Sequence, residues 1–166
     1  MRPALYCYPI SLPMINIDHN KGQKAQLFLR LALSAGFVFP VLDRLGAMGP
    51  AGSPHAVWGD WQHFVDYTQS LMPFVNHYLA SAAALIATSL ELLFAFCLFL
   101  GFQTRYAAYA SSLLTLVFAV FMAGSNGLMA PFKYPVFVFT GAAWLLAAVG
   151  SYSWSIDKLL GEAARS

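Results

Sequence analysis

The chain has 166 residues, of which 59% are hydrophobic and 10% are charged, and its formal net charge is +2. Soluble domains are usually about 25% charged, so this composition indicates a membrane protein and excludes the dense basic surface that nucleic-acid binding needs. We therefore expect one all-α domain, an integral membrane four-helix transmembrane bundle.

The N-terminal part of the chain, residues 1–26, is predicted to form a polar segment. Three prolines interrupt it, and it lacks the apolar run of a cleavable signal peptide. The first predicted span covers about residues 27–46 and would itself direct insertion into the membrane.

A lid helix is predicted at residues 58–72, between the first and second spans. Its apolar side chains follow helical spacing, and Trp58 and Trp61 flank the acidic Asp60. Aromatic residues favour the bilayer interface, so we expect an amphipathic interfacial helix. It would act either as a passive cover over the helix ends or as a functional lid.

Three more spans are predicted at about residues 77–101, 105–123 and 134–150. The first two are joined by only three residues and should form a tight antiparallel pair. They complete a four-span membrane domain at 27–150, which is followed by a tail at 151–166.

The lysines and arginines predict the orientation of this bundle. Seven of the nine lie at the termini or beside the turn between the second and third spans, and Arg44 and Lys133 lie on the other side. By the positive-inside rule, both termini and the tail should be cytoplasmic.

The most informative single residue is Glu91, which lies in the apolar run from Tyr78 to Gly101. A charge there costs roughly 2.5 kcal/mol or more, so it needs a partner, and Arg30 and Arg105 are the candidates. We predict a polar pocket in the cytoplasmic half, where Glu91 relays a proton or binds the polar head of a lipid-soluble substrate. The alternative is a structural ion pair that fixes the helix register.

Two adjacent charges, Asp43 and Arg44, mark the far end of the first span. Neighbouring helix positions point about 100° apart, so we do not expect both to face one groove. We interpret them as an ordinary interfacial helix end, with pairing to Asp60 or His63 of the lid as the alternative.

Metal and haem sites are not favoured. The spacing of His63 and His77 matches no established ligand motif, and Cys7 and Cys97 form no CxxC pair. No histidine lies inside a predicted span to bind haem, and nucleotide-binding and hydrolase motifs are absent from the sequence.

Several sequence features occur together in a set order. They are LFLRLAL and DRLG in the first span, WGDWQHFVDYTQSLMPF in the lid, LIATSLELLFAFCLFLGFQTR in the second span and APFKYPVF before the last. Over about residues 26–160 this pattern resembles the DoxX family of small bacterial four-span membrane proteins. The resemblance implies a four-helix bundle in the bacterial inner (cytoplasmic) membrane and association with membrane-linked oxidoreduction.

The resemblance also implies roles for particular residues. It points to Arg30, Glu91 and Arg105 as a polar cluster. It points to the Trp-Gly-Asp sequence at 58–60 as the lid signature, and it supplies no catalytic residue. Relatives are described as subunits of a thiosulfate:quinone oxidoreductase or as partners of redox-defence enzymes.

We therefore expect a subunit of a membrane-bound oxidoreductase or respiratory-type complex, either non-catalytic or quinone-interacting, without a covalently bound cofactor. A quinone pocket would form around Glu91 and Arg30, with the nearby aromatic residues Phe94, Phe96 and Phe99 as apolar bulk. The alternatives are a redox-inert structural or assembly subunit and, third, a small-solute carrier.

Overall fold

The computed structural model describes residues 19–163, so most of the predicted polar N-terminal segment lies outside the described residues. All regular structure in this part of the chain is helical. The helices are α1 (His19–Arg44), α2 (Trp61–Leu71), α3 (His77–Leu100), α4 (Thr104–Asn126), α5 (Ala130–Lys133), α6 (Val136–Val149) and α7 (Ile156–Ala163).

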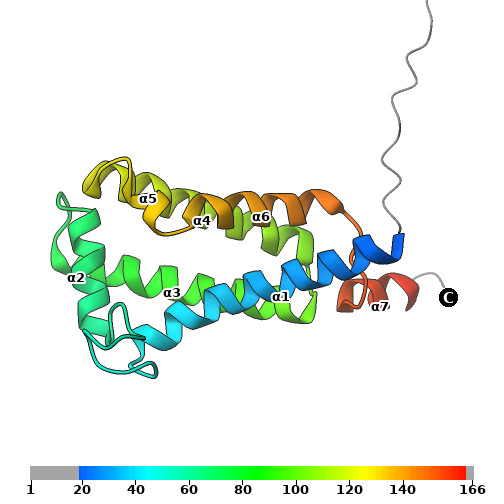
Figure 1. Ribbon diagram of the computed structural model, residues 1–166, viewed down its shortest axis with the longest axis horizontal. Helices are drawn as coiled ribbons and strands as arrows, with labels where there is room; N and C mark the ends of the chain where they lie inside the picture. Colours follow the sequence, from blue (N-terminus) through cyan, green and yellow to red (C-terminus); the bar gives the residue numbers. More distant parts are fainter. Residues whose placement is uncertain (1–18, 164–166) are drawn as a thin grey trace, which may run out of the picture.

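The long helices form two layers, with α1 packed on α3 and α4 packed on α6 (Figure 1). Helix α2 lies across one end of both layers and contacts α3 and α4. The start of α1, the turn between α3 and α4, and α7 lie at the opposite end. We call these the lid end and the inner end.

Three helices, α1, α3 and α4, are long and apolar enough to cross a membrane. Helix α6 is apolar but has 14 residues, which is about 21 Å against a hydrocarbon thickness of about 30 Å. Pro135 precedes its first turn, and a proline there disfavours helix at the residue before it. The prediction of an all-α membrane bundle is confirmed in this form, and a complete fourth span stays a prediction.

Small residues bring α4 and α6 together. Ala108 of α4 and Ala143 and Ala147 of α6 are completely buried, which lets the two backbones approach closely. The hydroxyl groups of Thr115 and Thr140 lie 2.9 Å apart, and the Ser112 hydroxyl donates to the Thr140 carbonyl at 3.1 Å. These contacts pack α4 and α6 closely together as one layer of the bundle.

The inner end is held by the segment after α6. The carboxylate of Asp157 accepts hydrogen bonds from the backbone N–H groups of Gln103, at 2.7 Å, and Thr104, at 2.8 Å. Gln103 makes no side-chain cap of its own. Asp157 therefore supplies the N-terminal cap of α4 from a distant part of the sequence.

Gly36 of α1 makes one of the contacts between the two layers. A side chain at Gly36 would overlap the ring of Phe139 on α6, which also packs edge-on against Phe37 at a centroid distance of 5.7 Å. The absence of a side chain at Gly36 therefore lets Phe139 close this seam between α1 and α6.

We expect Gly36→Ala to lower the free energy of unfolding by about 1–3 kcal/mol, because the added methyl group forces Phe139 to move. The matched control is Gly141→Ala, where a Cβ atom meets nothing within 4 Å and alanine gains up to about 1 kcal/mol of helix propensity. Equilibrium unfolding in detergent measures both changes. Equal effects of the two substitutions would contradict the packing role of Gly36.

Candidate functional site

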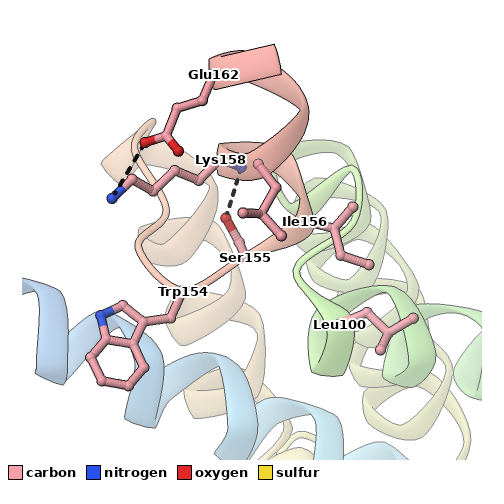
Figure 2. A pocket seen from close by; sticks show the side chains of 7 residues that line it. Leu100, Trp154, Ser155, Ile156, Lys158 and Glu162 are labelled. Atoms are coloured by element: carbon pink, nitrogen blue, oxygen red, sulfur yellow. Dashed lines mark hydrogen bonds and ion pairs between the residues drawn. The ribbon is translucent and has the colours of Figure 1, made fainter.

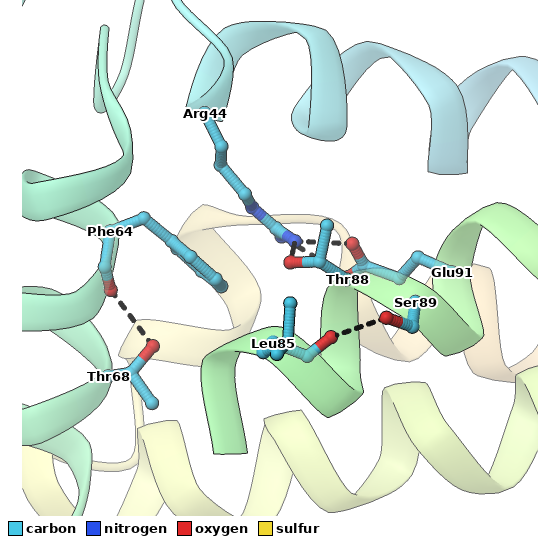
Figure 3. Close-up of polar contacts among 7 residues, drawn as sticks. All are labelled: Arg44, Phe64, Thr68, Leu85, Thr88, Ser89 and Glu91. Carbon is cyan, nitrogen blue, oxygen red and sulfur yellow. Dashed lines mark hydrogen bonds and ion pairs between the residues drawn. The ribbon is translucent and has the colours of Figure 1, made fainter. Parts of the chain in front are cut away.

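A buried ion pair joins the last residue of α1, Arg44, to Glu91 in the interior of α3. Arg44 Nη1 lies 2.5 Å from Glu91 Oε2, and Arg44 Nη2 donates to Glu91 Oε1 at 3.2 Å. Arg44 Nη1 also donates to the Thr88 hydroxyl at 2.9 Å, and Figure 3 shows the three side chains converging. The side chains of the pair are only 4% and 5% exposed, so this is a two-pronged, charge-assisted contact shielded from solvent.

The predicted partners of Glu91 were therefore wrong, and the reason is the direction of side chains on helices. A Cα–Cβ bond tilts toward the N-terminus of its helix. Helix α1 starts at the inner end and α3 at the lid end, so Arg44 leans inward while Glu91 leans toward the lid. The two side chains meet between their backbones, and the pair faces the lid half of the bundle rather than the predicted cytoplasmic half.

Arg30 leans away from Glu91 and lies at the inner end. It is 2% exposed, and its Nη2 donates to the Trp154 carbonyl at 2.7 Å. Within the described part of the chain its Nε and Nη1 have no hydrogen-bond partner. A Cβ atom at Gly101 would lie 2.6 Å from Arg30 Nη1, so a glycine at this turn makes room for the guanidinium group.

Arg105 is also separate from the ion pair. Its guanidinium group lies 6.0 Å from the centroid of the Tyr109 ring on the same helix. The structure thus does not bring Arg30, Glu91 and Arg105 together as one cluster. It brings together Arg44, Glu91 and Thr88.

The second charge at the end of α1, Asp43, holds the loop before α2. Its Oδ2 accepts from the backbone N–H groups of Val57, at 2.9 Å, and Trp58, at 3.0 Å, and its Oδ1 accepts from Gly59 at 3.1 Å. Asp43 is 3% exposed. The interpretation of Asp43 and Arg44 as an ordinary interfacial helix end was wrong, because one binds the lid loop and the other the bundle interior.

The lid also covers the ion pair directly. The guanidinium carbon of Arg44 lies 3.7 Å from the centroid of the Phe64 ring and 5.0 Å from that of Trp58. Trp58 and Phe64 pack edge to face at 5.2 Å. Cation–π contacts of this kind gain strength where water is excluded, so Arg44 links the lid to Glu91.

The other two predicted lid residues have local roles. Asp60 is the N-cap of α2, accepting from the His63 backbone N–H at 2.9 Å and contacting the His63 ring at 2.8 Å. These hydrogen bonds from His63 hold the pKa of the exposed Asp60 carboxyl below its usual value. Trp61 packs on Phe64 at 5.9 Å. Neither Asp60 nor Trp61 is among the residues that contact the ion pair.

An apolar cavity of about 840 Å³ lies beneath the lid, between the two layers. Such a volume is within the range of small-molecule sites, about 300–1,000 Å³. Its walls are mostly aliphatic and aromatic, and Arg44, Glu91 and Thr115 are among its few polar members. Arg44 Nε is buried and has no hydrogen-bond partner among the described residues, so the cavity is lined by an arginine with one donor to spare.

A second, smaller hollow of about 360 Å³ lies beside α7 at the inner end. Figure 2 shows its exposed ion pair, Lys158–Glu162 at 3.7 Å, and the Ser155 hydroxyl that accepts from the Lys158 backbone N–H. An exposed i,i+4 pair contributes little. Among residues 19–163 no cluster of three histidine, cysteine, aspartate or glutamate side chains could hold a metal ion.

Sequence reasoning missed Arg44, Asp43 and Thr88 as members of the site. Thr88 precedes Glu91 by three positions on α3, so it shares a helix face with the carboxylate. Arg44 could have been found by applying the side-chain tilt to a pair of antiparallel helices. The role of Asp43 depends on a loop conformation that no local pattern predicts.

A family model described as DoxX matches residues 25–125. The match covers more than half of the chain and includes the lid, Arg44 and Glu91, which confirms the resemblance found in the sequence. Neither a search of curated proteins nor a search of solved structures gave a match.

Proposed function

The chain belongs to the DoxX family, and from this premise we propose that it is a quinone-interacting subunit of a membrane-bound oxidoreductase. The quinone ring would occupy the apolar cavity beneath the lid, beside Arg44 and Glu91. The chain would bind and orient the ring. The two electrons for quinone reduction would come from a redox partner subunit, and the two protons from solvent.

One observation carries this proposal: a cavity of ligand size has a buried arginine in its wall, and the Nε of that arginine has no hydrogen-bond partner within residues 19–163. A quinone needs an apolar cleft with a few placed polar groups, and its carbonyl oxygens accept hydrogen bonds. Arginine is a donor only, so Arg44 matches a carbonyl ligand. The aromatic rings of Phe118 and Phe121 in the same wall match its ring.

The same proposal puts the protein in the bacterial inner membrane with both termini cytoplasmic. The start of α1 and α7 lie at one end of the bundle (Figure 1). Of the described basic residues, Lys21, Lys24, Arg30, Arg105 and Lys158 belong to that inner end. The lid would then face the outside.

Quinone binding can be measured by tryptophan fluorescence, because Trp58 lines the cavity. We expect a short-tailed ubiquinone analogue to quench the fluorescence of the purified protein in lipid nanodiscs, with saturation. Trp58→Phe should remove most of the saturable quenching. The matched control Trp144→Phe removes a tryptophan on α6 that is 59% exposed and outside the cavity lining, and should leave the saturable part intact.

Two results would overturn the quinone proposal. One is quenching that rises linearly without saturation, as expected for quinone merely dissolved in the lipid. The other is saturable quenching that Trp144→Phe removes and Trp58→Phe does not, which would put the quinone on the outside of α6.

A second candidate, a redox-inert assembly subunit, is favoured by the way Arg44 connects the lid to α3. In that case the ion pair shapes a docking surface rather than a ligand site. Glu91→Gln should then lower the yield of the assembled complex without changing quinone turnover per complex. Lower turnover per complex at normal yield would favour the quinone proposal instead.

A further inference from the structure

The cavity lies at the depth of the membrane-spanning helices. It is lined by residues of α1, α3 and α4, the three helices of membrane-crossing length. Outside these helices the surroundings are lipid chains rather than water. Access to the cavity therefore depends on which of its sides is closed.

Packed residues narrow three sides of the cavity. At the lid end, Phe64 and Val65 are 6% and 2% exposed, and the Ser125 hydroxyl fastens the Leu71 carbonyl of α2 to α4 at 2.6 Å. At the inner end, Leu98 and Leu146 are fully buried in the main core. Between α1 and α6, Phe139 fits against Gly36, and Tyr134, which lines the cavity just before α6, is 48% exposed.

The fourth side, between α3 and α4, is different. These helices separate from their shared turn toward the lid (Figure 1), and the residues of α3 facing the gap include the small Ala83 and Ala87. Ile86 and Val117 line the cavity from opposite helices, yet they are 60% and 40% exposed. Both side chains border the cavity and the exterior, and both lie on helices of membrane-crossing length.

The polarity of the cavity decreases from its interior toward the side between α3 and α4. Arg44 and Glu91 are buried in its interior, while Ile86 and Val117, the more exposed lining residues of α3 and α4, are apolar. A ligand that satisfies both regions has a polar head with an acceptor oxygen and an apolar chain. A head lodged near Arg44 would direct its chain outward between α3 and α4.

We propose that the cavity opens sideways to the lipid between α3 and α4, and that it takes a single-chain amphiphile dissolved in the bilayer. The head lies inside near Arg44, and the apolar tail leaves past Ala87 and Val117 into the hydrocarbon. This inference rests on the proposed function, because it gives the route and orientation of the quinone.

The direct test uses a benzoquinone whose hexadecyl tail ends in a photoreactive diazirine, added to the wild-type protein in nanodiscs. After irradiation, mass spectrometry locates the labelled residues. The opening predicts competitor-sensitive labels on Ile86, Val117 and their lipid-facing neighbours on α3 and α4. Labels concentrated on Tyr134 and Val136, which line the cavity at the start of α6, would overturn it.

A pair of variants tests the same opening by binding. Ala87→Phe fills the gap and should weaken binding of the long-tailed quinone by at least about tenfold, while a tailless benzoquinone binds within about twofold. The matched control Leu85→Phe adds similar bulk to an outward-facing residue, 59% exposed and outside the cavity lining, and should change neither.

The outcomes separate this inference from the proposed function. Equal weakening of tailed and tailless quinones by Ala87→Phe, or no weakening of either, would overturn the lateral opening. Saturable quenching of Trp58 fluorescence in the wild-type protein would still support quinone binding in that case. No saturable binding of any quinone by the wild-type protein would overturn both.

Discussion

Replacing Glu91 with leucine is expected to destabilise the protein by about 3–5 kcal/mol, because it leaves a buried charge without its partner. Arg44 is 4% exposed and packed under Phe64, and its remaining side-chain hydrogen-bond partner among the described residues would be the Thr88 hydroxyl. A guanidinium group cannot lose its proton in a protein. The charge therefore stays in the bundle or forces the lid away so that water can reach it.

The reverse substitution, Arg44→Met, should cost less than Glu91→Leu. It leaves a carboxyl group, which can take up a proton and become neutral. The double variant Arg44→Met/Glu91→Leu removes both charges and should be more stable than Glu91→Leu alone, since a buried pair can be replaced by apolar residues of similar volume at little cost. The coupling energy of this double-mutant cycle, from wild type, the two single variants and the double variant, measures the interaction between Arg44 and Glu91.

The measurement is equilibrium unfolding of the four proteins in the same detergent, followed by helical circular dichroism. The matched control is Glu162→Leu on α7, where the carboxylate is exposed and 3.7 Å from Lys158, and the expected change is within about 0.5 kcal/mol. A loss for Glu91→Leu no larger than for this control would contradict a stabilising role for the pair.

The helices themselves follow from the sequence, because they depend on local patterns. Apolar runs of membrane length predict α1, α3 and α4. An aspartate before an amphipathic run predicts the start of α2, where Asp60 is the cap. These features depend on residues a few positions apart, which periodicity and capping rules can relate.

Contacts between distant segments could not be predicted in the same way. Asp157 caps α4 across more than fifty positions, and Arg44 meets Glu91 across 47. A count of residues along the helices favours Arg30 and Arg105, the nearest charges by depth, because such a count ignores the tilt of side chains. The cavity is likewise a property of packing between layers, to which five helices contribute lining residues.

The second large effect is expected at Asp43, whose replacement by alanine should destabilise the protein by on the order of 3 kcal/mol. Its carboxylate accepts from the backbone N–H groups of Val57, Trp58 and Gly59. Hydrogen bonds to a charged acceptor contribute about 1.5–3 kcal/mol each, and a donor left buried without a partner costs about 1–3 kcal/mol. Water entering the freed loop offsets part of this sum.

Gly59 makes the loop depend further on Asp43. Its φ is +73°, a backbone conformation that favours glycine. A Cβ atom at this position would also collide with the backbone of Pro50 and Ala51, because the two stretches of loop pass very close to each other. The three hydrogen bonds from these N–H groups to Asp43 compensate for the conformational entropy that is lost when the loop is ordered. Without their shared acceptor, the loop should open and release Trp58 from Arg44.

A graded series distinguishes this acceptor role from simple loss of bulk. Asp43→Asn keeps the shape but offers one acceptor oxygen in place of two, so it can serve Val57 and Trp58 while its amide group faces the Gly59 N–H. It should therefore lie between wild type and Asp43→Ala in stability. Hydrogen exchange at the amides of residues 57–59 should be slowest in the wild type, faster in Asp43→Asn and fastest in Asp43→Ala.

The control is Asp66→Asn on α2, whose carboxylate accepts from the exposed Gln62 side chain and should change stability by less than about 0.5 kcal/mol. If Asp43→Asn and Asp43→Ala are equally destabilised with unchanged exchange at residues 57–59, the carboxylate does not hold the loop. If exchange rises there and Trp58 quenching by quinone is lost as well, Asp43 sets the position of the lid, and Arg44 and the cavity depend on it.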